Sequence, residues 1–170
     1  MSTENLNAPS YVNQEFEDLS LMLFQDREDP TYKSELLDEK RLDFSVESLK
    51  HLDSYLEVLH SARPQQKDLV GVVLRCGAYV GEVIRKNSPN KMNWVTFQEA
   101  AKYSESAKRL GHSLATAGIL WTKDQKMYFP LAKICKFLEN GNEDSVYFFA
   151  RVALDLTKKH STPYDQRQDA

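Results

Sequence analysis

Residues 66–87, "QKDLVGVVLRCGAYVGEVIRKN", form the stretch around which the rest of this 170-residue chain has to fold. Read as a helix, the stretch carries apolar side chains on nearly its whole circumference. A helix that is apolar on every side is a buried one. We therefore expect a helix over about 66–87 at the centre of the protein, with the other elements packed around it.

Two glycines, Gly77 and Gly81, lie four residues apart on one face of this predicted helix. Together they cost a helix about 2 kcal/mol relative to alanine. Close approach of a neighbouring helix or strand explains the pair most simply. A groove that admits a ligand is the alternative.

A carboxylate, Glu82, lies on the same helix, with Arg85 and Lys86 within one turn of it. A buried carboxylate must find partners or shift its pKa. We expect Glu82 to be partly or fully buried and paired with a cation, or with backbone donors near the strand that carries Trp94. The functional alternative is a binding site formed by Tyr79, Glu82, Arg85 and Trp94.

The predicted fold class is α+β and mostly helical. Two buried helices, about 66–87 and 143–158, are expected to pack with a small antiparallel sheet of two or three strands. "NWVTF" predicts a strand over about 92–97, and a hairpin is predicted from strands at 118–122 and 126–129. The last helix is apolar on most sides, so we expect it to lie beside the central one.

Turn and capping signals place the other helices. Thr96 and Glu99 have capping-box spacing and predict one exposed helix that ends at Gly111. Pro130 suits the first position of a further helix. Earlier in the chain, apolar spacing predicts helices over 12–23 and from Ser45 up to Arg63–Pro64.

Residues 11–158 are expected to form a single domain between two disordered tails, 1–10 and 159–170. The segment 26–43 has seven acidic and four basic residues, which accounts for the whole formal net charge of −3. It predicts an acidic surface connector, with one short helix near Leu36–Leu37.

Composition excludes several classes of protein. No basic excess or stripe of the kind that nucleic-acid-binding proteins show is present. No apolar run approaches the roughly 20 residues that cross a membrane, and the first ten residues do not read as a secretory signal. Cys76 and Cys135 both lie in apolar helical patterns and predict free thiols. We therefore expect a cytoplasmic protein that binds neither nucleic acid nor membrane.

The motif "GHSLA", 111–115, resembles the nucleophile elbow of a hydrolase around Ser113. An elbow needs a hydrophobic strand directly before it, whereas a charged helix is predicted there. Gly111 is then the glycine that ends that helix, and Ser113 is not a nucleophile. The histidines and cysteines lack metal-ligand spacing, and no phosphate-binding glycine loop occurs. We predict no catalytic residue, metal or cofactor.

Three motifs, "GAYVGEVIR", "NWVTF" and "FPLAKICKFLENGNEDSVYFF", resemble a family of small bacterial domains of unassigned function. The resemblance covers about residues 44–155. It implies a standalone cytoplasmic bacterial protein and supplies no catalytic residue.

Two hypotheses about function follow. The first is a non-enzymatic protein-interaction module that binds a protein partner or itself, with an antitoxin-like immunity protein as its narrower form. The second is a small-ligand-binding protein or enzyme with a site around Tyr79, Glu82, Arg85 and Trp94. A flat exposed apolar patch favours the first, and a concave apolar pocket with converging polar groups favours the second.

Overall fold

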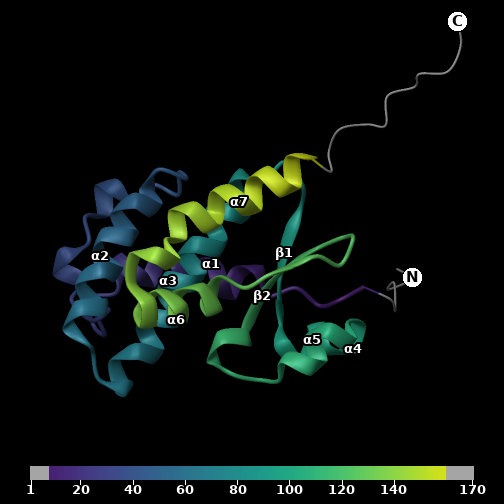
Figure 1. The fold of residues 1–170 in the computed structure, drawn as a ribbon, viewed down its shortest axis with the longest axis horizontal. Helices are drawn as coiled ribbons and strands as arrows, with labels where there is room; N and C mark the ends of the chain where they lie inside the picture. The colour runs from purple at the N-terminus through teal and green to yellow at the C-terminus, as the bar shows by residue number, and fades with distance from the viewer. Residues whose placement is uncertain (1–7, 160–170) are drawn as a thin grey trace, which may run out of the picture.

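The computed structural model describes residues 8–159 and confirms an α+β fold that is mostly helical (Figure 1). Most of both predicted tails, 1–10 and 159–170, lies outside the described residues. The helices are α1 (Asn13–Gln25), α2 (Ser48–Ala62), α3 (Gln66–Asn87), α4 (Phe97–Tyr103), α5 (Glu105–Leu110), α6 (Pro130–Asn140) and α7 (Val146–Lys159). The strands are β1 (Met92–Thr96), β2 (Gly118–Thr122) and β3 (Met127–Tyr128).

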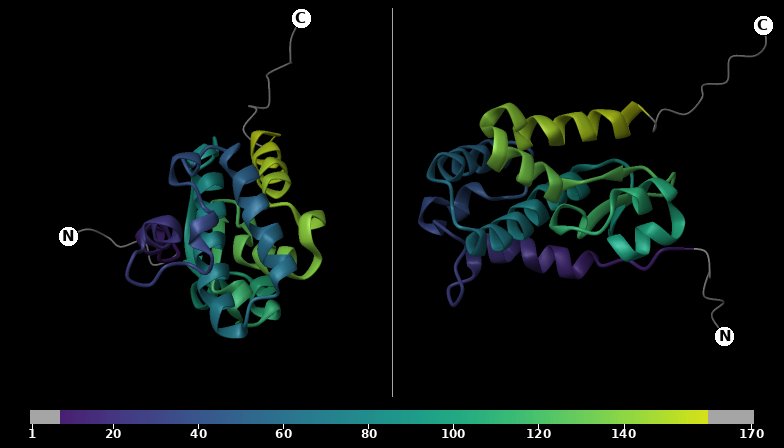
Figure 2. Two further views of the ribbon diagram at one scale, coloured as in Figure 1. Left: turned by 90° about the vertical axis from the view of Figure 1, so that its left-hand side faces the viewer. Right: turned by 60° about the horizontal axis from the view of Figure 1, so that its bottom comes forward.

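Helix α3 lies at the centre with the bounds predicted for it, and its residues from Val72 to Ile84 are buried except Leu74. Helices α1, α6 and α7 and strand β2 all pack against it. In Figure 2 α1 and α7 lie on opposite sides of the molecule with α3 between them. Burial of this middle part explains why only Arg75 and Glu82 are charged between Val72 and Ile84.

The two glycines of α3 allow close packing, as predicted. A Cβ atom at Gly77 would lie 2.8 Å from the Leu131 side chain of α6. At Gly81 it would overlap the ring of Trp94 on β1. Each position therefore accepts a neighbour that any larger residue would displace.

The three strands form one antiparallel sheet in the order β1-β2-β3, in which Trp94 pairs with Leu120 and Leu120 with Tyr128. The free edge of β1 is covered by the chain before α1. There the Val12 amide donates to the Trp94 carbonyl over 2.9 Å, and the Trp94 amide donates to Asn13 Oδ1 over 2.7 Å. The strand predicted at 92–97 ends at Thr96, because Phe97 already begins α4, and the strand predicted at 126–129 is confined to Met127–Tyr128.

The prediction of a single helix between Thr96 and Gly111 is wrong, because the helix is broken at Ser104. The backbone of Ser104 is extended, and its side chain accepts a hydrogen bond of 3.2 Å from the Ala107 amide, which starts α5. Gly111, with φ +74°, ends α5 as predicted. Ser113 then precedes a short 3₁₀ helix, Leu114–Thr116, so the "GHSLA" motif does not form a nucleophile elbow.

The acidic connector contains two short 3₁₀ helices, Ser34–Leu36 and Glu39–Arg41, where one was predicted. The buried Arg75 of α3 holds its beginning in place. One Arg75 nitrogen donates to the Asp29 carbonyl (2.7 Å) and to Thr31 Oγ1 (3.1 Å), and the other lies 3.0 Å from Asp26 Oδ2. The connector is thus fixed to the central helix at its start.

The last helix begins at Val146 rather than at 143, because residues 141–144 form a 3₁₀ helix. Asp53 of α2 accepts the Val146 amide over 2.7 Å and Ser145 Oγ accepts the Phe148 amide over 3.1 Å, so both side chains cap the start of α7. One face of α7, including Ala150, is buried. The opposite face exposes Phe148 and Val152 to solvent.

Candidate functional site

Glu82 is fully buried and paired, as predicted. Its Oε1 accepts hydrogen bonds from Trp94 Nε1 over 2.8 Å and from Arg85 Nε over 2.7 Å. Its Oε2 accepts a further bond of 2.9 Å from Arg85. These three charge-assisted hydrogen bonds satisfy both oxygens of the buried carboxylate.

The cluster extends to α1. Glu17 lies 2.7 Å from Lys86 and 3.9 Å from Arg85, and the hydrogen bond from Lys86 lowers the pKa of Glu17. The hydrogen bond to Glu82 raises the pKa of Arg85. Phe16 stacks on Trp94 with ring centroids 4.1 Å apart. The cluster therefore joins α1, α3 and β1 through matched charges and stacked rings.

Tyr79 is also buried, but its hydroxyl has different partners. It accepts a hydrogen bond of 3.1 Å from the Phe44 amide and lies 2.7 Å from Ser48 Oγ. Burial raises the pKa of this phenol. The structure thus brings Glu82, Arg85 and Trp94 together and directs the Tyr79 hydroxyl toward the start of α2. Contacts within the chain occupy all four side chains, and their role in binding stays a prediction.

A surface groove lies among the end of α5, strand β3, α6 and α7, with a volume of about 410 Å³. We call it the α6–α7 groove. The charged side chains in its lining are lysines, and the rest are apolar or carry a hydroxyl. The lining residues are Leu110, Thr116, Met127, Tyr128, Phe129, Ala132, Lys133, Lys136 and Phe149.

Two lysines give the groove its charge. Lys133 lies 2.6 Å from Asp144, and its hydrogen bond lowers the pKa of that carboxyl group. Lys136 is exposed and forms no ion pair within residues 8–159. Lys133 is therefore paired within the protein, whereas Lys136 acts on Asp144 only through its charge and keeps its hydrogen-bond donors for a partner.

Helix α7 continues the apolar surface beyond the groove. Phe148 directly precedes the lining residue Phe149 in sequence, and Val152 lies one helical turn after Phe148. The side chain of Phe148 is 68% exposed and that of Val152 is 41% exposed. Leu110 is exposed at the α5 end of the groove. The groove thus has an apolar lining with one unpaired cation, Lys136, and α7 exposes two further apolar side chains near the lining residue Phe149.

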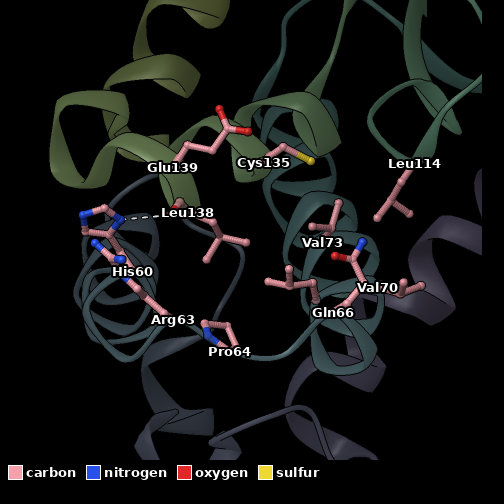
Figure 3. Close-up of a pocket in the computed structure, with 11 residues that line it drawn as sticks. His60, Arg63, Pro64, Gln66, Val70, Val73, Leu114, Cys135, Leu138 and Glu139 are labelled. Carbon is pink, nitrogen blue, oxygen red and sulfur yellow. Dashed lines mark hydrogen bonds between the residues drawn. The ribbon is translucent and has the colours of Figure 1, made fainter.

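A second hollow lies between the end of α2, the start of α3, and α6 (Figure 3). We call it the α2–α3 cleft. Its volume is about 490 Å³, and its lining combines apolar side chains with His60, Arg63, Gln66, Cys135 and Glu139. The ring nitrogen Nδ1 of His60 lies 2.9 Å from the Leu138 carbonyl oxygen, which fixes the imidazole against α6.

Within residues 8–159, no three His, Cys, Asp or Glu side chains are grouped in a way that could hold a metal ion. Cys76 and Cys135 are free thiols, and burial raises the pKa of both. No helix in the described part of the chain is long and apolar enough to cross a membrane.

Sequence reasoning missed both hollows. Phe148 and Lys136 belong to helices whose sequence patterns predict that one face is buried. These patterns do not predict which exposed side chains border a hollow. Which face stays open depends on the neighbours that the fold supplies. The signal that was available is the pair Phe148–Phe149, because adjacent residues on a helix point in directions about 100° apart and a helix with one buried face does not cover both equally.

Comparison with known protein families, with curated proteins and with solved structures finds no match to this chain. The resemblance to small bacterial domains therefore stays a prediction.

Proposed function

We propose that this chain is a non-enzymatic protein-interaction module whose partner binds at the α6–α7 groove. The observation that carries the proposal is the 68% exposure of Phe148 beside a groove whose charged lining residues are lysines. A large aromatic side chain in water is costly, and burying it on a partner contributes about 1.5–3 kcal/mol. Aromatic anchors of this kind dominate many protein interfaces.

The groove favours a particular kind of partner: a segment with apolar side chains and at least one carboxylate. Its apolar side chains would cover Phe148 and Leu110, and its carboxylate would pair with Lys136. An antitoxin-like immunity role would make that partner a toxin. A cytoplasmic location is consistent with this proposal because neither Cys76 nor Cys135 forms a disulfide.

Selection from a displayed library of random peptides tests the proposal. We expect the wild-type protein to enrich peptides that combine aromatic or aliphatic residues with Asp or Glu. Lys136→Glu reverses the charge of the groove and should abolish that enrichment. Lys91→Glu is the matched control, because Lys91 is an exposed lysine outside the groove, in the segment before β1.

Two results contradict the proposal: enrichment of peptides without acidic residues, and equal enrichment by the wild type and Lys136→Glu. Sedimentation of the protein alone, over a range of concentrations, detects self-association. A dimer that Phe148→Ser dissociates would assign the same surface to a second copy of the chain.

A further inference from the structure

The α2–α3 cleft shares no lining residue with the α6–α7 groove, and it has a different chemistry. Its floor is apolar: Val73 is buried, and Leu69 and Leu138 are half-buried. Figure 3 shows Leu138 from α6 and Val73 from α3 on facing sides of the cleft. A volume of about 490 Å³ is within the range of small-molecule pockets.

One cation stands at the rim of the cleft. Arg63 directly follows α2 in a left-handed conformation (φ +50°), and its amide donates to the Leu59 carbonyl over 3.0 Å. Pro64, whose ring fixes its own φ, comes next. The backbone of Arg63 is therefore well defined. Its guanidinium group is exposed and forms no hydrogen bond or ion pair within the described part of the chain, so its donors are available to a ligand.

The other polar side chains of the cleft are less suited than Arg63 to binding a charged ligand group. His60 is held by the Leu138 carbonyl, and burial keeps the Cys135 thiol neutral by raising its pKa. Gln66 is uncharged. The carboxylate of Glu139 is exposed, and in Figure 3 it points away from Val73 and Leu138. Arg63 is thus the charge best placed to receive the polar end of a molecule that lies on the apolar floor.

We infer that the α2–α3 cleft binds a small molecule with an apolar body and a carboxylate, the body on Val73 and Leu138 and the carboxylate on Arg63. A guanidinium group binds a carboxylate through two parallel hydrogen bonds, which gives both affinity and orientation. This inference does not depend on the proposed function, because it rests on a different part of the molecule.

Three probes that share an eight-carbon alkyl tail and differ in their polar head group test the inference by calorimetry. They are octanoate, octanol and octylammonium. We expect octanoate to bind roughly tenfold or more tightly than octanol, the ratio that a hydrogen-bonded charge contributes. Octylammonium should bind more weakly than octanol. Equal binding of all three, tightest binding of octylammonium through Glu139, or no binding of octanoate would each overturn the inference.

Two variants locate the binding. Arg63→Gln should weaken octanoate binding roughly tenfold and leave octanol binding unchanged. Val70→Trp should block both ligands, because Val70 lines the cleft with a side chain that is 46% exposed and tolerates a larger group. Arg27→Gln, an exposed arginine of the connector, is the control and should bind like the wild type. Undiminished octanoate binding by either Arg63→Gln or Val70→Trp would place the ligand elsewhere and contradict the inference.

Discussion

Helices α3 and α7 both have sequences that are apolar on most sides. The two helices nevertheless lie in different surroundings. Between Val72 and Ile84 helix α3 is enclosed by its neighbours, and its buried polar side chains Arg75, Tyr79 and Glu82 each have partners within the chain. Helix α7 packs on α2, α3 and α6 with one face only and leaves Phe148 in solvent.

This difference in surroundings shows that an apolar helix sequence does not by itself indicate whether the helix has a structural or a binding role. Where the fold supplies all the neighbours, as around α3, even a carboxylate such as Glu82 has a structural role. Where the fold leaves one face uncovered, as on α7, the apolar side chains are available to a partner. The predictions below test whether α3 is closed and α7 is open.

The largest effect is expected at Gly81. Gly81→Leu should prevent stable folding, because the added side chain has to displace a Trp94 ring that is stacked on Phe16 and bonded to Glu82. Gly71→Ala on the same helix is the control: no atom lies within 4 Å of the added Cβ, and stability should rise by up to about 1 kcal/mol. Thermal unfolding followed by circular dichroism measures both. A Gly81→Leu protein that melts like the wild type would show that α3 is open on this face.

Glu82→Gln should lower the free energy of unfolding by about 3 kcal/mol, because Arg85 loses its buried counter-charge. Urea denaturation gives the value. Lys50→Met, which breaks the exposed pair of Lys50 and Glu47, is the control and should change stability little. A Glu82→Gln protein within about 0.5 kcal/mol of the wild type would instead make Glu82 a candidate binding residue.

Much smaller effects are expected on the open face of α7. Phe148→Ser should change stability by no more than about 0.5 kcal/mol, because the ring has few neighbours to lose. Ala150→Asp, two residues away on the buried face, should destabilise the protein strongly by burying an unpaired carboxylate. Urea denaturation of both variants compares the two faces directly. If the two substitutions were equally damaging, the open-face description of α7 would be wrong.

The smallest expected effect is on the pH dependence of stability, and it comes from His51 of α2, which contacts the connector. His51 is almost fully buried and accepts a hydrogen bond of 2.9 Å from the Asp38 amide, so it is held neutral. Burial and the neighbouring Arg41 lower its pKa, while Asp38 raises it by less. The unfolded chain therefore binds the proton more tightly than the folded protein. The stabilisation is full above the unfolded pKa of about 6.5 and is lost as the pH falls through the lower, folded pKa.

His51→Gln should remove this part of the pH dependence. The unfolding free energies of wild type and variant, measured at about pH 7 and about pH 5, give the comparison. Wild type should lose more stability on acidification than His51→Gln. An equal loss in both proteins would show that His51 does not titrate in this way.

Local signals and apolar periodicity were sufficient to predict α3, the hairpin of β2 and β3, and the starts of α4 and α6. They also predicted the packing role of Gly81 and the burial of Glu82. The errors lie where distant residues act. Asp53 of α2 helps to cap α7, and Arg75 of α3 binds the start of the connector. Neither contact has a signal in local spacing, and the open face of α7 depends in the same way on neighbours that only the fold defines.

The most direct test of the central claim, that the open face of α7 and its groove bind a protein segment, is the affinity of one selected acidic peptide for wild type and Phe148→Ser. Isothermal titration calorimetry measures both dissociation constants, and circular dichroism confirms that the variant is folded. We predict that Phe148→Ser weakens binding at least about tenfold, the effect of losing one aromatic anchor. Affinities that agree within about twofold would contradict the account, because the peptide would then bind a surface that does not include Phe148.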